Sequence, residues 1–227
     1  MKHILLTALV LLPLCFHAQN TAFGVMLGAS NYQGDLSERH VTIVETHLAG
    51  GIFVRRQILP KLTIKGNFYA GRISGDDANY ANRLSRGFKY SSPLLEGGLN
   101  FEWDILGRAR NLRRGYYSKV ITPYLLTGFG AVYYNPDIQG LPDNAEEKKY
   151  DTRNFNFIIP LGAGFKGDLT PQITLGLEFV THLPFTDYLD GVSESAEPGN
   201  HDWYGFAGIT LQYWFDAPVA AYKKEEW

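Results

Sequence analysis

The segment from Leu94 to Ile105 alternates regularly between apolar and polar side chains. Because successive side chains of a β-strand point to opposite faces, this pattern predicts a strand with one apolar face and one polar face. The apolar face carries Leu95, Gly97, Leu99, Phe101, Trp103 and Ile105, and the other carries Glu96, Gly98, Asn100, Glu102 and Asp104. Carboxylates opposite an aromatic stripe favour a barrel with lipid outside and polar groups inside.

Seven further segments have a comparable pattern, so the chain is predicted to form eight strands. The predicted strands cover residues 21–31, 45–58, 61–74, 90–105, 121–134, 154–167, 172–183 and 202–215. Each is long enough for the roughly 9–11 residues with which a tilted strand crosses a bilayer. The predicted fold is therefore all-β, an eight-stranded antiparallel transmembrane β-barrel of the outer-membrane type.

The connections between the predicted strands are of two kinds. Residues 59–61 and 169–172 are tight turns, whereas 32–44, 75–89, 135–153 and 184–201 are long and polar. Short turns at one rim and long loops at the other are typical of outer-membrane barrels, with both termini on the periplasmic side. The connection over 106–120 departs from this pattern, because it is long and contains no acidic residue. Its cations are Arg108, Arg110, Arg113, Arg114 and Lys119.

The first 18 residues have the features of a cleavable signal peptide. Lys2 provides the positive start, the apolar stretch runs from Ile4 to Phe16, and cleavage is expected after Ala18. Residues 19–215 would then form the barrel and 216–227 a short periplasmic tail. The single cysteine, Cys15, lies within the leader. The mature chain is therefore expected to have no disulfide and no cysteine-based metal site.

Composition narrows the function without deciding the fold. The chain has 21 Lys and Arg residues against 23 Asp and Glu, a balance that argues against nucleic acid as a partner. The aromatic content of 14% and the 24 glycines suit a membrane barrel, but they also suit a soluble β-sandwich. A soluble lipocalin-like barrel is the main alternative fold, and the charged faces of the predicted strands speak against it. We expect no cofactor, no metal and no small-molecule substrate.

The charges on the inward faces form the first candidate site. They are Lys65, Glu96, Glu102, Asp104, Lys166 and Glu178, with Arg55 as a further partner. An eight-stranded barrel is only wide enough for its own side chains, so these groups are expected to pair as a polar network that fills the lumen. A narrow proton or ion path is the alternative. Such a lumen is too small for a polypeptide.

A second candidate lies where the seventh and eighth predicted strands meet the outer rim. It comprises His182, Asp187, Asp190, His201 and Asp202. Such a cluster could activate water or bind a metal ion. The spacing matches no metal-binding signature, so hydrogen bonding to the loop backbone is the favoured interpretation.

Several short motifs, taken in order along the chain, resemble a known family. They are Asn31-Tyr32-Gln33-Gly34-Asp35-Leu36, Gly75-Asp76-Asp77, Thr122-Pro123-Tyr124-Leu125, the segment Phe185 to Ser193, and Asp202-Trp203-Tyr204. Together they resemble the PorG-like outer-membrane proteins of the Bacteroidetes type IX secretion system. The resemblance implies an integral barrel without catalytic activity that is linked to the periplasmic ring of the secretion machine.

These observations predict a non-enzymatic outer-membrane protein that anchors a type IX secretion complex. Outer-membrane lipid surrounds it, and a periplasmic protein is the expected partner. The basic segment 106–120 is the candidate contact for that partner, because a surface of one charge sign attracts an oppositely charged one. Two alternatives remain: a stand-alone barrel whose outer loops bind a ligand, and a hydrolase with its site at the rim.

Overall fold

The computed structural model describes residues 20–33, 45–76, 89–106, 121–139, 154–184 and 203–215. All eight predicted strands are present, and their ends differ from the predicted ones by at most two residues. The strands are β1 (Thr21–Gln33), β2 (His47–Leu59), β3 (Leu62–Asp76), β4 (Lys89–Asp104), β5 (Ile121–Tyr134), β6 (Asp137–Gln139), β7 (Asn154–Asp168), β8 (Ile173–Pro184) and β9 (Trp203–Trp214). Within these ranges no helix is long and apolar enough to cross a bilayer.

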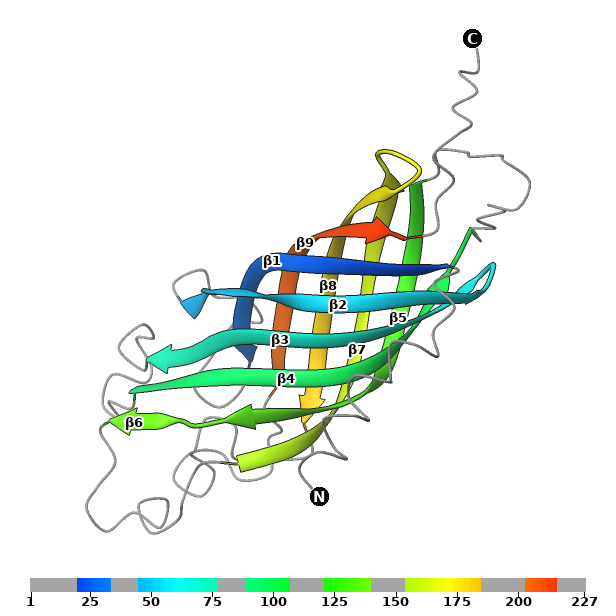
Figure 1. Cartoon of the computed structure of the whole chain (residues 1–227). Coiled ribbons are helices and arrows are strands. Elements are labelled where there is room, and N and C mark those ends of the chain that lie inside the picture. Colours follow the sequence, from blue (N-terminus) through cyan, green and yellow to red (C-terminus); the bar gives the residue numbers. More distant parts are fainter. Residues whose placement is uncertain are drawn as a thin grey trace, which may run out of the picture.

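The strands form one closed antiparallel ring (Figure 1). Apart from β6, neighbours along the chain pair with each other, so that β5 pairs with β7, and β1 pairs with β9 from Ala22–Trp214 to Gln33–Trp203. Closure leaves no free edge around the main body of the ring, and a gap lies between β2 and β3, whose ladder ends at Gly50–Ala70. The prediction of an eight-stranded antiparallel barrel is confirmed.

The short strand β6 continues the direction of β5 and is not a ninth strand of the closed ring. It follows Asn135 and Pro136 and pairs with Lys89–Ser91 of β4, beyond the last β4–β5 pair. Proline has no N–H to donate to the ladder, so the strand is interrupted at that point. Figure 1 shows β6 next to the start of β4, outside the main body of the barrel.

The polarity of the barrel is inverted relative to that of a soluble protein. On the outer face Phe157 is 69% exposed, Trp103 53% and Leu177 48%, whereas Glu102 and Lys65 inside are fully buried. The outer surface is a belt of large apolar side chains, and the charged groups lie in the lumen. This arrangement is the one that a hydrocarbon environment requires, and it defines the fold as an outer-membrane-type transmembrane barrel.

The two ends of the barrel differ in their connections. At one end, which we call the turn rim, β2 joins β3 through Pro60 and Lys61, and β7 joins β8 through residues 169–172. The second turn is stabilised by Thr170, whose Oγ1 accepts hydrogen bonds from the backbone N–H groups of Gln172 and Ile173, with N–O distances of 3.2 and 2.9 Å. We call the opposite end, where His47, Asp76 and Lys89 begin or end their strands, the far rim.

Glycines that face the lumen allow the strands to curve into so narrow a ring. A Cβ atom on Gly128 would lie 2.2 Å from the carbonyl oxygen of Leu99, and one on Gly162 would lie 2.4 Å from that of Phe179. Both contacts are with backbone atoms of the neighbouring strand, which cannot move away without breaking the ladder. Small inward residues are thus a condition for closure.

The inverted polarity predicts a depth-dependent response to charge on the outer face. Leu177→Arg, in the middle of the apolar run of β8, should destabilise the folded barrel by about 2–4 kcal/mol, because the cation must enter hydrocarbon. Leu169→Arg, at the turn rim, should cost about 1 kcal/mol or less. Urea unfolding of both variants in lipid vesicles measures the difference. Equal losses at the two positions would contradict the proposed membrane orientation of the outer face.

Candidate functional site in the barrel lumen

The six side chains predicted to face inward all lie buried in the lumen. They are Lys65, Glu96, Glu102, Asp104, Lys166 and Glu178, and none is more than 4% exposed. Alternation places them there, because each lies at an inward position of its strand. Five of them belong to one ion-paired network in the half of the lumen next to the turn rim, and Glu96 belongs to a separate cluster.

Arg55 on β2 is the centre of the ion-paired network. Its Nε donates to Glu102 Oε1 at 2.8 Å, and its Nη2 donates to Glu178 Oε2 at 2.9 Å. The remaining hydrogen bonds go to Gln212 Oε1 at 2.5 Å and to the Tyr124 hydroxyl at 3.2 Å. A planar guanidinium with five donors can satisfy several acceptors at once, and here it joins five strands across the lumen.

Two lysines complete the network. Lys166 Nζ lies 3.0 Å from Glu102 Oε2 and 2.7 Å from Asp104 Oδ1, and Lys65 pairs with Glu178 Oε1. The cations Arg55, Lys65 and Lys166 thus match the carboxylates Glu102, Asp104 and Glu178 in number. A buried charge is tolerated when it is paired and hydrogen-bonded. Equal numbers of cations and carboxylates therefore allow these charged side chains to occupy the lumen.

Aromatic rings enclose the cations of the network. The Arg55 guanidinium lies 4.5 Å from the centroid of the Phe53 ring, and Lys166 Nζ lies 4.6 Å from that of Tyr124. The Tyr124 hydroxyl donates to Glu178 Oε2 at 2.7 Å. Tyr124 therefore holds an anion with its hydroxyl and a cation with its ring face.

Glu96 on β4 forms a second polar cluster, further from the turn rim. It accepts hydrogen bonds from the Tyr204 hydroxyl at 2.9 Å and from Asn67 Nδ2 at 3.1 Å. His182 Nε2 lies 3.1 Å from the same carboxylate, and its ring stacks on Tyr204 at 4.6 Å between centroids. The prediction that His182 belongs to a rim cluster is wrong, because its place on β8 turns it into the lumen, where it is 1% exposed.

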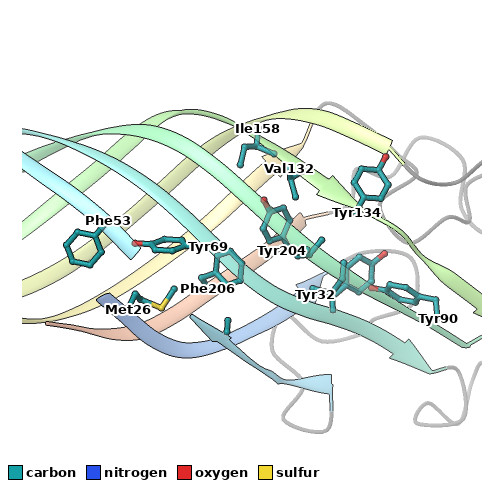
Figure 2. Packing of buried hydrophobic residues seen from close by; sticks show 13 residues of the cluster. Met26, Tyr32, Phe53, Tyr69, Tyr90, Val132, Tyr134, Ile158, Tyr204 and Phe206 are labelled. Carbon is teal, nitrogen blue, oxygen red and sulfur yellow. The ribbon is translucent and has the colours of Figure 1, made fainter. Parts of the chain in front are cut away.

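The rest of the lumen towards the far rim is filled by aromatic and aliphatic side chains. Figure 2 shows this series of side chains along the barrel from Phe53 through Tyr69 and Tyr204 to Tyr90. Tyr32 and Tyr90 meet edge to face at 5.1 Å between ring centroids. Large, fully buried side chains thus occur along the described lumen from Arg55 and Tyr124 near the turn rim to Tyr32 and Tyr90 near the far rim.

Two groups of predicted residues lie outside the described ranges. One is the basic segment with Arg108, Arg110, Arg113, Arg114 and Lys119. The other is the remainder of the rim cluster, namely Asp187, Asp190, His201 and Asp202. The proposed leader, 1–18, and the tail, 216–227, are also outside the described residues. Among the residues that are described, no group of three or more His, Cys, Asp and Glu side chains is placed to hold a metal ion.

Four residues that complete the lumen clusters are not among the predicted site residues: Gln212, Tyr124, Tyr204 and Asn67. All four are uncharged, whereas the prediction is based on charged inward positions. The alternation of the sequence does place each of them at an inward position of its strand. The alternation does not tell which inward positions of different strands lie at the same level of the lumen.

A closed antiparallel ring with an apolar exterior and a buried polar interior that contains an ion-paired network defines the class of protein: a small outer-membrane-type β-barrel. The chain belongs to the family described as Domain of unknown function (DUF6089), which matches residues 2–222. No curated protein matches the sequence.

Several solved barrels are similar to this chain at low sequence identity. Neisserial surface protein A is 13% identical with a TM-score of 0.46, over 87% of this chain and 98% of that one. Ail, the attachment invasion locus protein of Yersinia pestis, is 10% identical with a TM-score of 0.45, over 85% and 97%. OprG from Pseudomonas aeruginosa is 9% identical with a TM-score of 0.39, over 85% and 95%. Identities this low transfer no function to the chain.

The network predicts that substitution of Arg55 destabilises the barrel far more than the same substitution of its neighbour Arg56. Arg55→Leu should destabilise the barrel by about 3–5 kcal/mol, because it leaves the ion-paired network with one uncompensated negative charge. Arg56→Leu, on the outward face, should change stability by about 1 kcal/mol or less. Adding Glu178→Gln to Arg55→Leu again gives the network equal numbers of cations and carboxylates and should recover part of the lost stability. Urea unfolding measures all three, and equal effects at positions 55 and 56 would refute the central role of Arg55.

Proposed function

We propose that this protein is an integral outer-membrane barrel that anchors a type IX protein secretion complex and conducts nothing through its own lumen. The observation that carries the proposal is the filled interior, in which Arg55, Glu102, Lys166 and their partners span the barrel. A barrel without a passage acts through its rims and its outer surface. The resemblance of the ordered motifs to PorG-like proteins supports the assignment to type IX secretion.

The geometry of the turn rim supports its role as the face that contacts the partner. Thr21 at the start of β1 and Trp214 at the end of β9 both lie at this rim. The chain also leaves β4 after Asp104 and enters β5 at Ile121 at the same rim, on the side of the ring opposite β1 and β9, so segment 106–120 starts and ends at this rim. We infer that this rim faces the periplasm, where the arginines would meet an acidic surface of a ring protein.

In this proposal the barrel supplies position rather than chemistry. The belt of apolar side chains fixes its depth in the outer membrane, and the interior network resists deformation when the partner pulls on the rim. Charge attraction between the basic segment and the partner would depend on salt, because exposed charges are screened over about 8 Å at physiological ionic strength.

The role in secretion is tested by removing the protein and then only its basic segment. A deletion strain should retain type IX cargo inside the cell, and the wild-type gene should restore export. The variant with Gln at positions 108, 110, 113 and 114 should insert normally but no longer co-purify with ring proteins at low salt. Gln at Arg56 and Lys61, cations of the described turn-rim region, is the matched control.

Each outcome of that experiment separates the alternatives. Normal cargo export in the deletion strain would overturn the secretion role and favour a stand-alone barrel with ligand-binding loops. Unchanged co-purification of the Gln variant would overturn the docking role of the basic segment while leaving the secretion role in place.

The filled lumen makes a prediction of its own. Purified barrel inserted into planar bilayers should show no stepwise conductance in molar salt, because the Arg55 network and the buried aromatic side chains cross the narrow lumen. A porin of known conductance, added to the same bilayer, shows that the measurement works. Reproducible channel steps from the wild-type barrel that disappear on heat unfolding would contradict the closed interior.

A further inference from the structure

Strands β2 and β3 separate before they reach the far rim. Their last ladder pair is Gly50–Ala70, although β2 runs on to His47 and β3 to Asp76. Side chains bridge the gap in place of backbone pairs. Ser30 Oγ donates to the Arg72 carbonyl at 2.5 Å, and the backbone N–H of Asp76 donates to Glu45 Oε1 at 3.1 Å.

A serine and a histidine meet in this gap. The Ser74 Oγ and the His47 Nε2 are 2.7 Å apart, and both side chains are half-buried. This is the distance at which an imidazole can accept the proton of a serine hydroxyl. Arg72, two residues before Ser74 on the same outward face of β3, is exposed. A serine, an imidazole and an exposed cation thus lie at one part of the barrel wall.

The position of this group relative to the membrane indicates its substrate. On the outward face of β3 the apolar run ends at Ala70, and Arg72 and Ser74 follow it on the same face. At about 3.3 Å per residue, Ser74 lies just beyond the hydrocarbon, at the level of lipid ester groups. The groove that Thr46 borders does not belong to this group, because its walls come from β1, β7, β8 and β9 and include neither Ser74 nor His47. The level of Ser74 along the barrel axis is therefore what indicates a lipid ester.

We propose that Ser74 and His47 hydrolyse a carboxylic ester of a membrane lipid. Ser74 Oγ attacks the ester carbonyl carbon while its proton passes to His47 Nε2, and the oxyanion that forms faces Arg72. The ester C–O bond then breaks, and His47 gives the proton to the leaving alcohol. Water cleaves the acyl-serine in the same way, which releases a fatty acid and restores Ser74. This activity is independent of the anchoring role proposed above.

Labelling with a fluorophosphonate tests the site without assuming a lipid. In the folded barrel the probe should attach to Ser74, as located by peptide mass spectrometry, and Ser74→Ala should remove the adduct. His47→Gln should slow labelling about 100-fold or more, because the base is lost. Ser91→Ala is the matched control, since Ser91 pairs with Ser74 on β4 and has the same outward orientation. Heat-modified gel migration shows that each variant is folded.

A second experiment tests which membrane lipid, a phospholipid or lipopolysaccharide, supplies the ester that is hydrolysed. The folded barrel is incubated with phosphatidylethanolamine vesicles or with lipopolysaccharide, and released fatty acid is measured against Ser74→Ala. Release from either one identifies the substrate. No adduct on Ser74, or equal labelling of His47→Gln, would overturn the catalytic pair, and labelling without release from either lipid would overturn the lipid-ester assignment. Cargo export should be unchanged in Ser74→Ala, so this result is separable from the secretion role.

Discussion

A backbone that crosses hydrocarbon must pair every N–H and C=O group within the protein, and this requirement shapes the whole chain. Eight strands meet it by closing into a ring through the β1–β9 ladder. Closure at this strand number gives a narrow lumen that side chains must fill. The inward glycines, such as Gly128 and Gly162, follow from the same narrowness, because a Cβ at either position would collide with the next strand.

Two kinds of interaction hold the side chains in the lumen: ion pairs near one rim and apolar packing towards the other. Next to the turn rim, three cations and three carboxylates cancel one another around Arg55, and aromatic ring faces cover the cations. Towards the far rim, apolar packing of tyrosines, phenylalanines and aliphatic side chains takes over. The Glu96–His182–Tyr204 cluster lies between them. Ion pairs hold strands together across the barrel at the cost of desolvation, and the aromatic part contributes packing without that cost.

Because side chains occupy the lumen, we expect this protein to act through its outer surface and its two rims. The two rims differ: one carries the tight turns, the terminal strands and the ends of the basic segment, and the other carries a gap between β2 and β3 that side chains bridge. The proposed anchoring uses the first rim, and the proposed lipid-ester hydrolysis uses the second. Both use the barrel as a rigid support whose depth in the membrane is set by its apolar belt.

The sequence by itself determined the number of strands, their ends to within two residues, and which face of each strand meets lipid, because the two-residue period is a local property of the chain. It also determined that Lys65, Glu102, Asp104, Lys166 and Glu178 face inward. Only the tertiary structure decided that Arg55 joins Glu102 and Glu178, that His182 turns inward to Glu96 rather than to the rim, and that Ser74 meets His47. These contacts depend on the register and shear of the closed ring, which set the level of each residue along the barrel axis. Alternation gives a residue's face but not its height, so residues far apart in sequence find each other only when the ring closes.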